Sequence, residues 1–205
     1  SLLDADVDYY CHQVNCQGRM GSGIAKAIKE KWPVVYSEYI QKYNDTEDNI
    51  LRNCGGFEHC PETSEVLLGD IQLVQVDKTH TVINMFAQEH YGYDGRRYTS
   101  YDGFWSCLGH IREFVPEGAT IGFPSHIGCG LGGGNWEVIK TMIEQKLIGV
   151  ICAIKKTFIA KTNGCTREKP KNTAIENTSF DRLLVKLQII IQQAIKTAVF
   201  PIDQS

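Results

Sequence analysis

The stretch HQVNCQGRMGSGIAKAIKEKWP (residues 12–33) constrains the fold of this chain more than any other. It places three glycines, Gly18, Gly21 and Gly23, within six positions, directly before residues that favour a helix. The first turn of a helix offers unpaired N–H groups and the positive end of its dipole, and glycine lets an anion approach the backbone closely. The stretch therefore predicts either a phosphate-binding loop or only a tight turn.

A second glycine-rich loop, SHIGCGLGGGNW (residues 125–136), also follows an expected strand and precedes an expected helix. Ligands of open α/β sheets bind beyond the carboxyl ends of the strands. Two such loops indicate a ligand with two phosphates, or with a phosphate and a sugar, held between them.

Two common nucleotide-binding classes do not fit these loops. The spacing Gly128-x-Gly130-x-x-Gly133 matches a dinucleotide fingerprint, but the next expected strand ends in two lysines and lacks the acidic residue that would hold a ribose. A Rossmann dehydrogenase is therefore not expected. The first loop lacks the Lys-Ser/Thr pair of a Walker motif, which argues against an ATPase.

Strands and helices are expected to alternate along the chain, with mostly polar loops over residues 44–64 and 87–97. The expected strands are 7–14, 65–68, 71–76, 81–86, 120–124 and 148–154, and the expected helices are about 22–31, 34–43, 99–114 and 136–146. This order predicts an α/β protein, a three-layer α/β/α sandwich with a mixed central sheet. The 205 residues suit one domain over residues 1–154, followed by a basic linker and an amphipathic C-terminal helix within residues 155–205, of unknown role.

Composition excludes several classes of protein. The net charge of −3 gives no reason to expect general nucleic-acid binding, and no apolar stretch approaches the roughly 20 residues of a membrane span. No basic segment of a signal peptide precedes the domain. The cluster Cys54-x4-His59-Cys60 lacks a second pair of zinc ligands, so idle, reduced thiols are expected there. We expect a cytoplasmic monomer without a metal or cofactor.

Three segments resemble macro domains, which are modules that bind ADP-ribose. VNCQGRMGSGIAKAIKEKWPVVYSEY and FPSHIGCGLGGGNWEVIKTMIE are similar to the two ligand loops of that family. AQEHYGYDGRRYTSYDGF is similar to a segment between these loops in a bacterial and phage branch. The resemblance covers residues 2 to about 147 and implies a three-layer α/β/α sandwich. It also implies ADP-ribose, or a derivative of it, as the binding partner.

The resemblance assigns roles to particular residues. It implies that Asn15 contacts the distal ribose, that the first loop lies along this ribose and the diphosphate, and that the second loop surrounds the phosphates with N–H groups. The ligand-binding residues implied in this way are Gly21, Ser22, Gly23, Ile24, Ala25, Ser125, Ile127, Gly128, Cys129, Gly130, Leu131 and Gly132.

Two branches of the family suggest different chemistry. One branch hydrolyses ADP-ribosyl esters with a lysine and an aspartate, but Gln88 and Gly132 occupy those positions here. Another branch, with a similar HxxN-C-x-G loop, removes phosphate from ADP-ribose 1″-phosphate and carries a histidine at the position of His12. Histidine exchanges protons near neutral pH, so His12 is the candidate acid/base, with a half-buried structural role as the alternative.

The remaining catalytic candidates come from the two loops. Asn15 is the candidate ribose anchor, and Asp94 is a carboxylate expected to face the same region. Arg96 and Arg97 are expected either to contact a terminal phosphate or to be a solvated pair.

The start of the chain departs from the family pattern. A macro domain usually begins with a strand whose terminal aspartate recognises adenine; this first strand has no counterpart, and Ser1 falls at the position of the aspartate. Asp4 or Asp6 is a weak substitute. Three functions follow, in this order: phosphate removal from ADP-ribose 1″-phosphate, removal of ADP-ribose from a modified protein or nucleic acid, and non-catalytic reading of ADP-ribose.

Overall fold

The computed structural model describes residues 2–54, 60–116 and 118–147; the strand predicted over 148–154, and the linker and helix predicted within 155–205, lie outside the described residues. Strands and helices succeed one another along the described residues without strict alternation. Their order is η1 (Leu2–Asp4), β1 (Tyr9–Asn15), α1 (Gly23–Lys31), α2 (Pro33–Cys54), α3 (Thr63–Leu67), β2 (Ile71–Gln75), β3 (Thr81–Gln88), α4 (Tyr101–Phe114), β4 (Ile121–Gly122) and α5 (Trp136–Lys146).

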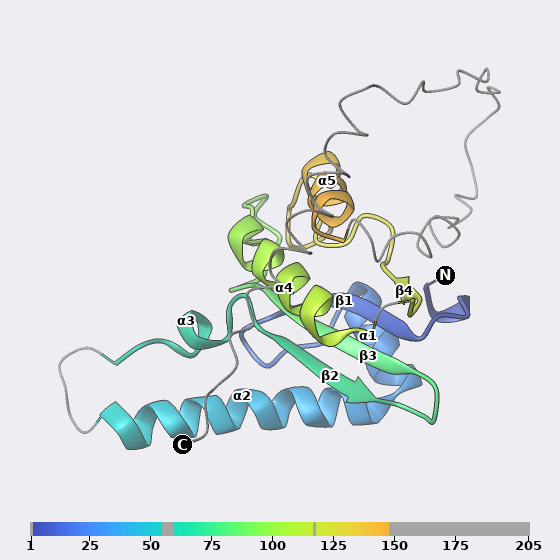
Figure 1. The fold of residues 1–205 in the computed structure, drawn as a ribbon. Helices are drawn as coiled ribbons and strands as arrows, with labels where there is room; N and C mark the ends of the chain where they lie inside the picture. The colour runs from blue at the N-terminus through green and yellow to red at the C-terminus, as the bar shows by residue number, and fades with distance from the viewer. Residues whose placement is uncertain (1, 55–59, 117, 148–205) are drawn as a thin grey trace, which may run out of the picture. The chain divides into compact units, whose positions relative to one another are not determined.

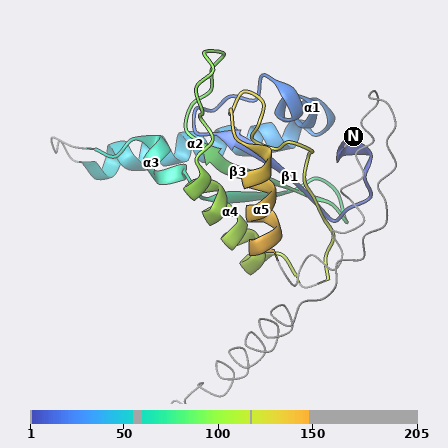
Figure 2. The same cartoon turned by 90° about the horizontal axis from the view of Figure 1, so that it is seen from above.

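The four described strands form one mixed sheet in the order β2-β3-β1-β4. Strand β1 is parallel to β3 and to β4, whereas β2 is antiparallel to β3. Helix α2 lies on one side of the sheet, and α4 and α5 lie next to each other on the other side (Figures 1 and 2). The predicted three-layer α/β/α sandwich with a mixed sheet is confirmed.

Two apolar cores, one on each face of the sheet, hold the layers together. Successive residues of β1 point to opposite faces, as the pleat of a strand requires. Cys11 packs in the core under α4 and α5, while Tyr10 and Val14 pack in the core against α1 and α2. Tyr39 of α2 is fully buried there and stacks on Phe86 of β3, with ring centroids 5.7 Å apart.

Helix α2 is longer than the sequence predicts. Pro33 begins it, since proline is tolerated in the first turn, but the helix continues past the expected end at Tyr43 to Cys54. The prediction of a loop from residue 44 was wrong, because these polar residues suit an exposed helix as well as a loop. An ion pair between Arg52 and Asp48, one turn apart and 3.5 Å long, is typical of such a helix.

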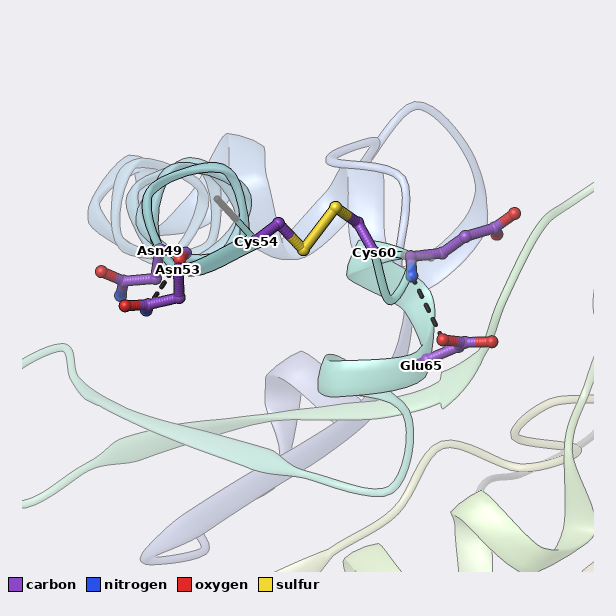
Figure 3. The surroundings of a disulfide bond; sticks show 6 residues. Asn49, Asn53, Cys54, Cys60 and Glu65 are labelled. Carbon is purple, nitrogen blue, oxygen red and sulfur yellow. Dashed lines mark hydrogen bonds between the residues drawn. A yellow bond between two sulfur atoms is a disulfide. The ribbon is translucent and has the colours of Figure 1, made fainter. Parts of the chain in front are cut away.

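The region after α2 also differs from its prediction. Residues 65–68 were expected as a strand, but Thr63–Leu67 form helix α3, whose N-terminus has a reciprocal capping box between Glu62 and Glu65. The prediction of idle, reduced thiols at Cys54 and Cys60 was also wrong. The two residues form a disulfide that joins the end of α2 to the segment before α3 (Figure 3).

Candidate functional site

The parallel pairing of β1 and β4 puts the carboxyl ends of both strands at one edge of the sheet, where both glycine loops begin. A pocket of about 520 Å³ opens between the loops, a volume in the range of small-molecule sites. Cys129 is the one predicted ligand residue outside the described lining; its Sγ donates to the Ile127 carbonyl at 3.4 Å. The predicted ligand residues that do line the pocket are Gly21, Ser22, Gly23, Ile24, Ala25, Ser125, Ile127, Gly128, Gly130, Leu131 and Gly132.

Helix α1 presents its N-terminus to this pocket without a side-chain cap. Ser22 occupies the N-cap position, but its hydroxyl accepts no capping hydrogen bond, and no acidic residue lies in the first turn. By contrast, Ser100 caps α4 and Asn135 caps α5 through their side-chain oxygens. The first N–H groups of α1 are therefore left to a ligand, and the helix dipole favours a negative one.

The charged side chains at the pocket also suit an anion. Arg19 and Lys29 line it, and none of the described lining residues is Asp or Glu. The Lys29 ammonium lies 3.6 Å from the centre of the Tyr36 ring, an arrangement that holds the cation at the pocket wall. A polar hollow adjoins the pocket and shares Arg19 and Tyr91 with it. Its lining is Gln17, Arg19, Tyr43, His90 and Tyr91.

Asn15 lies in the pocket lining and holds the first loop in shape. Its Oδ1 accepts hydrogen bonds from the backbone N–H of Gln17 at 2.9 Å and of Arg19 at 3.3 Å. Its Nδ2 donates to the Arg19 carbonyl at 2.8 Å. Below the loop, the Tyr39 hydroxyl donates to the Asn15 carbonyl at 2.7 Å and accepts from the Arg19 N–H at 3.1 Å. One hydrogen of the Asn15 amide remains for a ligand.

His12 does not lie among the residues that line the pocket. It is fully buried on the α2 side of the sheet, where its Nε2 is 2.6 Å from the Asn84 Oδ1. Burial outweighs this hydrogen bond and lowers the pKa of His12 to about 4. The side chain is thus neutral at pH 7, and the acid/base role predicted for it lacks access to the pocket in this structure.

Asp94 also lies outside the described lining and shapes the loop between β3 and α4. Its carboxylate accepts hydrogen bonds from the Arg96 N–H at 3.1 Å and the Tyr98 hydroxyl at 2.9 Å. These hydrogen bonds lower the pKa of Asp94. Neither Arg96 nor Arg97 lines the pocket, whereas the exposed Tyr91 and Tyr93 of the same loop do.

The glycines of the two loops differ in how much space surrounds them. A Cβ added at Gly21 or Gly130 would meet no atom within 4 Å. A Cβ at Gly132 would collide with the Thr99 hydroxyl, and one at Gly133 would lie 2.7 Å from the Arg96 carbonyl. Gly21 and Gly130 are therefore open toward a ligand, while Gly132 and Gly133 permit close packing inside the protein.

Sequence reasoning missed several residues of the pocket. Gln13 carried a signal, because a polar residue at the end of a buried strand, just before a glycine loop, must point somewhere specific. The helical residues Lys29 and Tyr36 carried no such signal, because the packing of α1 and α2 determines where their side chains point. The lining residues not predicted as ligand contacts are Gln13, Val14, Arg19, Met20, Lys29, Tyr36, Gln88, Tyr91, Tyr93, Pro124 and His126.

Residues 2–54, 60–116 and 118–147 contain neither a metal-binding cluster nor a membrane-spanning helix. No group of three or more His, Cys, Asp or Glu side chains in these ranges lies close enough together to hold a metal ion. No helix in them combines the length and apolar character needed to cross a bilayer.

Curated proteins of two kinds are similar in sequence to this chain, although no protein-family model matches it. The DNA ADP-ribosyl glycohydrolase of Mycobacterium tuberculosis is 27% identical over 150 residues, 72% of this chain and 36% of that protein. The chain thus spans about a third of the length of the first curated relatives it matches. The ADP-ribose 1″-phosphate phosphatase of Aspergillus oryzae is 26% identical over 173 residues, 70% of this chain and 85% of that protein.

The solved structure of a macrodomain protein from Streptomyces coelicolor has the same fold, with a TM-score of 0.53 and 24% identity over 73% of this chain and 88% of that one. The mixed sheet, the two glycine loops at its edge and these likenesses lead to one class. That class is the macrodomain fold, as the sequence predicts.

Proposed function

We propose that this macrodomain binds ADP-ribose and hydrolyses a derivative of it. The observation that carries the proposal is the uncapped N-terminus of α1, which opens into a pocket whose described lining contains two cations and no carboxylate. A diphosphate provides the negative charge that this arrangement favours. The names of both curated relatives, a DNA ADP-ribosyl glycohydrolase and an ADP-ribose 1″-phosphate phosphatase, refer to ADP-ribose.

In this proposal the diphosphate lies between the first turn of α1 and the second glycine loop. Gly21 and Gly130 leave room for phosphate oxygens next to the backbone, and Arg19 and Lys29 add positive charge. Asn15 offers its remaining amide hydrogen to a ribose hydroxyl, so it is the residue that we propose as the ribose anchor.

The polar hollow beside the pocket favours a derivative over free ADP-ribose. It shares Arg19 of the first loop and Tyr91 of the β3–α4 loop with the pocket, and it provides space for a group attached to the ligand. Hydrolysis of such a derivative adds water across the bond to this group and releases ADP-ribose. Because His12 is buried away from the pocket, we propose that the loops position this water, without His12 as the acid/base.

Two derivatives are candidates. ADP-ribose 1″-phosphate is supported by the phosphatase, which this chain matches over 85% of its length. ADP-ribosylated DNA or protein is supported by the glycohydrolase and by the adjoining hollow, which is open to a larger group. Measuring phosphate release from the first substrate and ADP-ribose release from the second distinguishes them. Tight ADP-ribose binding without turnover of either would contradict hydrolysis and leave a reader of ADP-ribose.

Calorimetric titration with ADP-ribose, AMP and NAD tests the ligand first. We expect ADP-ribose to bind much more tightly than AMP. The variant Gly130→Glu tests the position of the diphosphate, because a side chain fits there without disturbing the fold and its charge would repel phosphate. Gly130→Gln, which has the same size without the charge, is the matched control. We expect Gly130→Glu to lose at least about tenfold in affinity relative to Gly130→Gln; equal affinities would place the diphosphate elsewhere.

A further inference from the structure

Three polar side chains beneath the second glycine loop form one hydrogen-bonded group, which we call the polar triad: Gln13, Gln88 and Thr99. Gln13 lies on β1, Gln88 ends β3, and Thr99 directly precedes the N-cap of α4. The Gln13 Nε2 donates to the Gln88 Oε1 and to the Thr99 Oγ1, at 2.8 Å each. The triad thus joins two neighbouring strands to the segment that leads into α4.

The carbonyl groups at the two ends of the triad determine the direction of its hydrogen bonds. The Gln88 Nε2 donates to the His90 carbonyl at 2.6 Å, so the Gln88 Oε1 faces Gln13 as an acceptor. The Thr99 hydroxyl donates its single hydrogen to the Gly128 carbonyl at 2.8 Å, so it must accept from Gln13. Both neighbours therefore require a donor from Gln13, and no alternative orientation of its amide satisfies them.

The second glycine loop rests directly on this triad. A Cβ at Gly128 would lie 2.6 Å from the Gln13 Oε1, and one at Gly132 would collide with the Thr99 hydroxyl. The Gly128 carbonyl also accepts from the Gly134 N–H at 2.8 Å, and the Gly132 carbonyl accepts from the Thr99 N–H at 2.8 Å. Two positions of the second glycine loop, Gly128 and Gly132, are thus held through Thr99.

We infer that the polar triad holds the second glycine loop in its ligand-binding conformation, with Thr99 as its positioning residue. A loop held in place before binding loses less conformational freedom on binding, which raises affinity without any new contact to the ligand. The inference rests on the proposed function for the identity of its ligand, ADP-ribose. The positioning itself is a property of the free protein.

The variant Thr99→Val tests the inference, because valine keeps the shape of threonine and removes both hydrogen bonds of its hydroxyl. We expect the dissociation constant for ADP-ribose to rise about tenfold, the effect of one well-formed hydrogen bond. Thr99→Ser restores the hydroxyl and should bind within about twofold of the unchanged protein, on the same reasoning about hydrogen bonds. Gln13→Met, which removes the central donor at similar size, should weaken binding as Thr99→Val does.

Hydrogen exchange in the ligand-free protein provides a measurement that does not depend on ADP-ribose. Amides of residues 128–134 should exchange faster in Thr99→Val and Gln13→Met, and at the normal rate in Thr99→Ser. Equal exchange and affinity in all four proteins would overturn the inference, as would equal losses in Thr99→Val and Thr99→Ser. If the unchanged protein does not bind ADP-ribose, the proposed function fails, and faster exchange confined to Thr99→Val and Gln13→Met still supports the role of the triad.

Discussion

An added Cβ at Gly130 would meet no atom within 4 Å, whereas at Gly132, two residues later, it would collide with the Thr99 hydroxyl and lie 2.6 Å from the Gly128 carbonyl. The same residue type thus has two different purposes within one loop. Gly130 leaves the backbone open toward the pocket. Gly132 lets the loop pack on the side chains beneath it. At the scale of single residues, the surroundings of each glycine decide between these purposes, and the glycine pattern does not.

This difference predicts unequal effects of the same substitution at the two positions. Gly132→Ala should lower the free energy of unfolding by about 1 to 3 kcal/mol, because the methyl group overpacks the loop against Thr99. Gly130→Ala should change it by less than about 1 kcal/mol, since the methyl group enters open space and alanine restricts the unfolded chain. Chemical denaturation of both variants measures the difference. Equal destabilisation would mean that the loop is not packed as described.

At the scale of elements, the start of α1 differs from the starts of α4 and α5. Asn135 caps α5 by accepting from the N–H groups of Glu137 at 2.9 Å and Val138 at 3.4 Å. Ser22 makes no such hydrogen bond at the start of α1, although serine is a good capping residue. Helix α1 thus lacks a stabilising contact at the end where a ligand would provide one.

The variant Ser22→Asp should therefore separate stability from binding. Its carboxylate caps α1 and complements the helix dipole, so we expect the free energy of unfolding to rise by about 0.5 to 1 kcal/mol. The same charge occupies the place proposed for phosphate, so affinity for ADP-ribose should fall at least about tenfold. Ser22→Asn is the control, because it caps without charge. Thermal unfolding and calorimetry measure both quantities; equal affinity of the two variants would argue against a phosphate at this helix.

At the scale of the whole molecule, His12 is a neutral histidine buried within the core. A line of polar side chains crosses three strands on the α2 side of the sheet: His12 contacts Asn84, and the Asn84 Nδ2 donates to the Gln72 Oε1 at 3.0 Å. The Gln72 Nε2 in turn donates to the Glu38 carbonyl of α2 at 2.8 Å. This line joins the sheet to the helix layer, and burial keeps His12 without a charge at neutral pH.

Burial of this neutral histidine predicts a pH dependence of unfolding. The folded-state pKa of His12 is lowered to about 4 from 6.5, so the unfolded chain binds a proton first as the pH falls. The contribution of His12 is fully present above pH 6.5 and is lost as the pH falls toward 4, by roughly 1 kcal/mol per pH unit. Denaturation of the unchanged protein and of His12→Gln between pH 7 and pH 4.5 measures it. A parallel pH profile for both proteins would mean that His12 is protonated in the folded state.

Local sequence signals predicted most of the elements. The helix expected over 136–146 has the bounds Trp136–Lys146, and Asn135 caps it as expected. The predictions for segments 44–54 and 65–68 were wrong for the same reason. A polar stretch can form a solvated helix, and a short apolar run can form a helix as readily as a strand, so packing and capping decided both.

The sequence alone determined the fold class and the two glycine loops at the ends of strands, because glycine spacing and the alternation of strands and helices are properties of neighbouring residues. Tertiary structure alone decided which side chains reach the pocket. His12 and Gln13 are adjacent in β1, yet His12 is buried on the α2 side of the sheet, and Gln13 lines the pocket. The pleat points neighbouring residues to opposite faces, and only the packing of the helix layers determines which face meets the second loop.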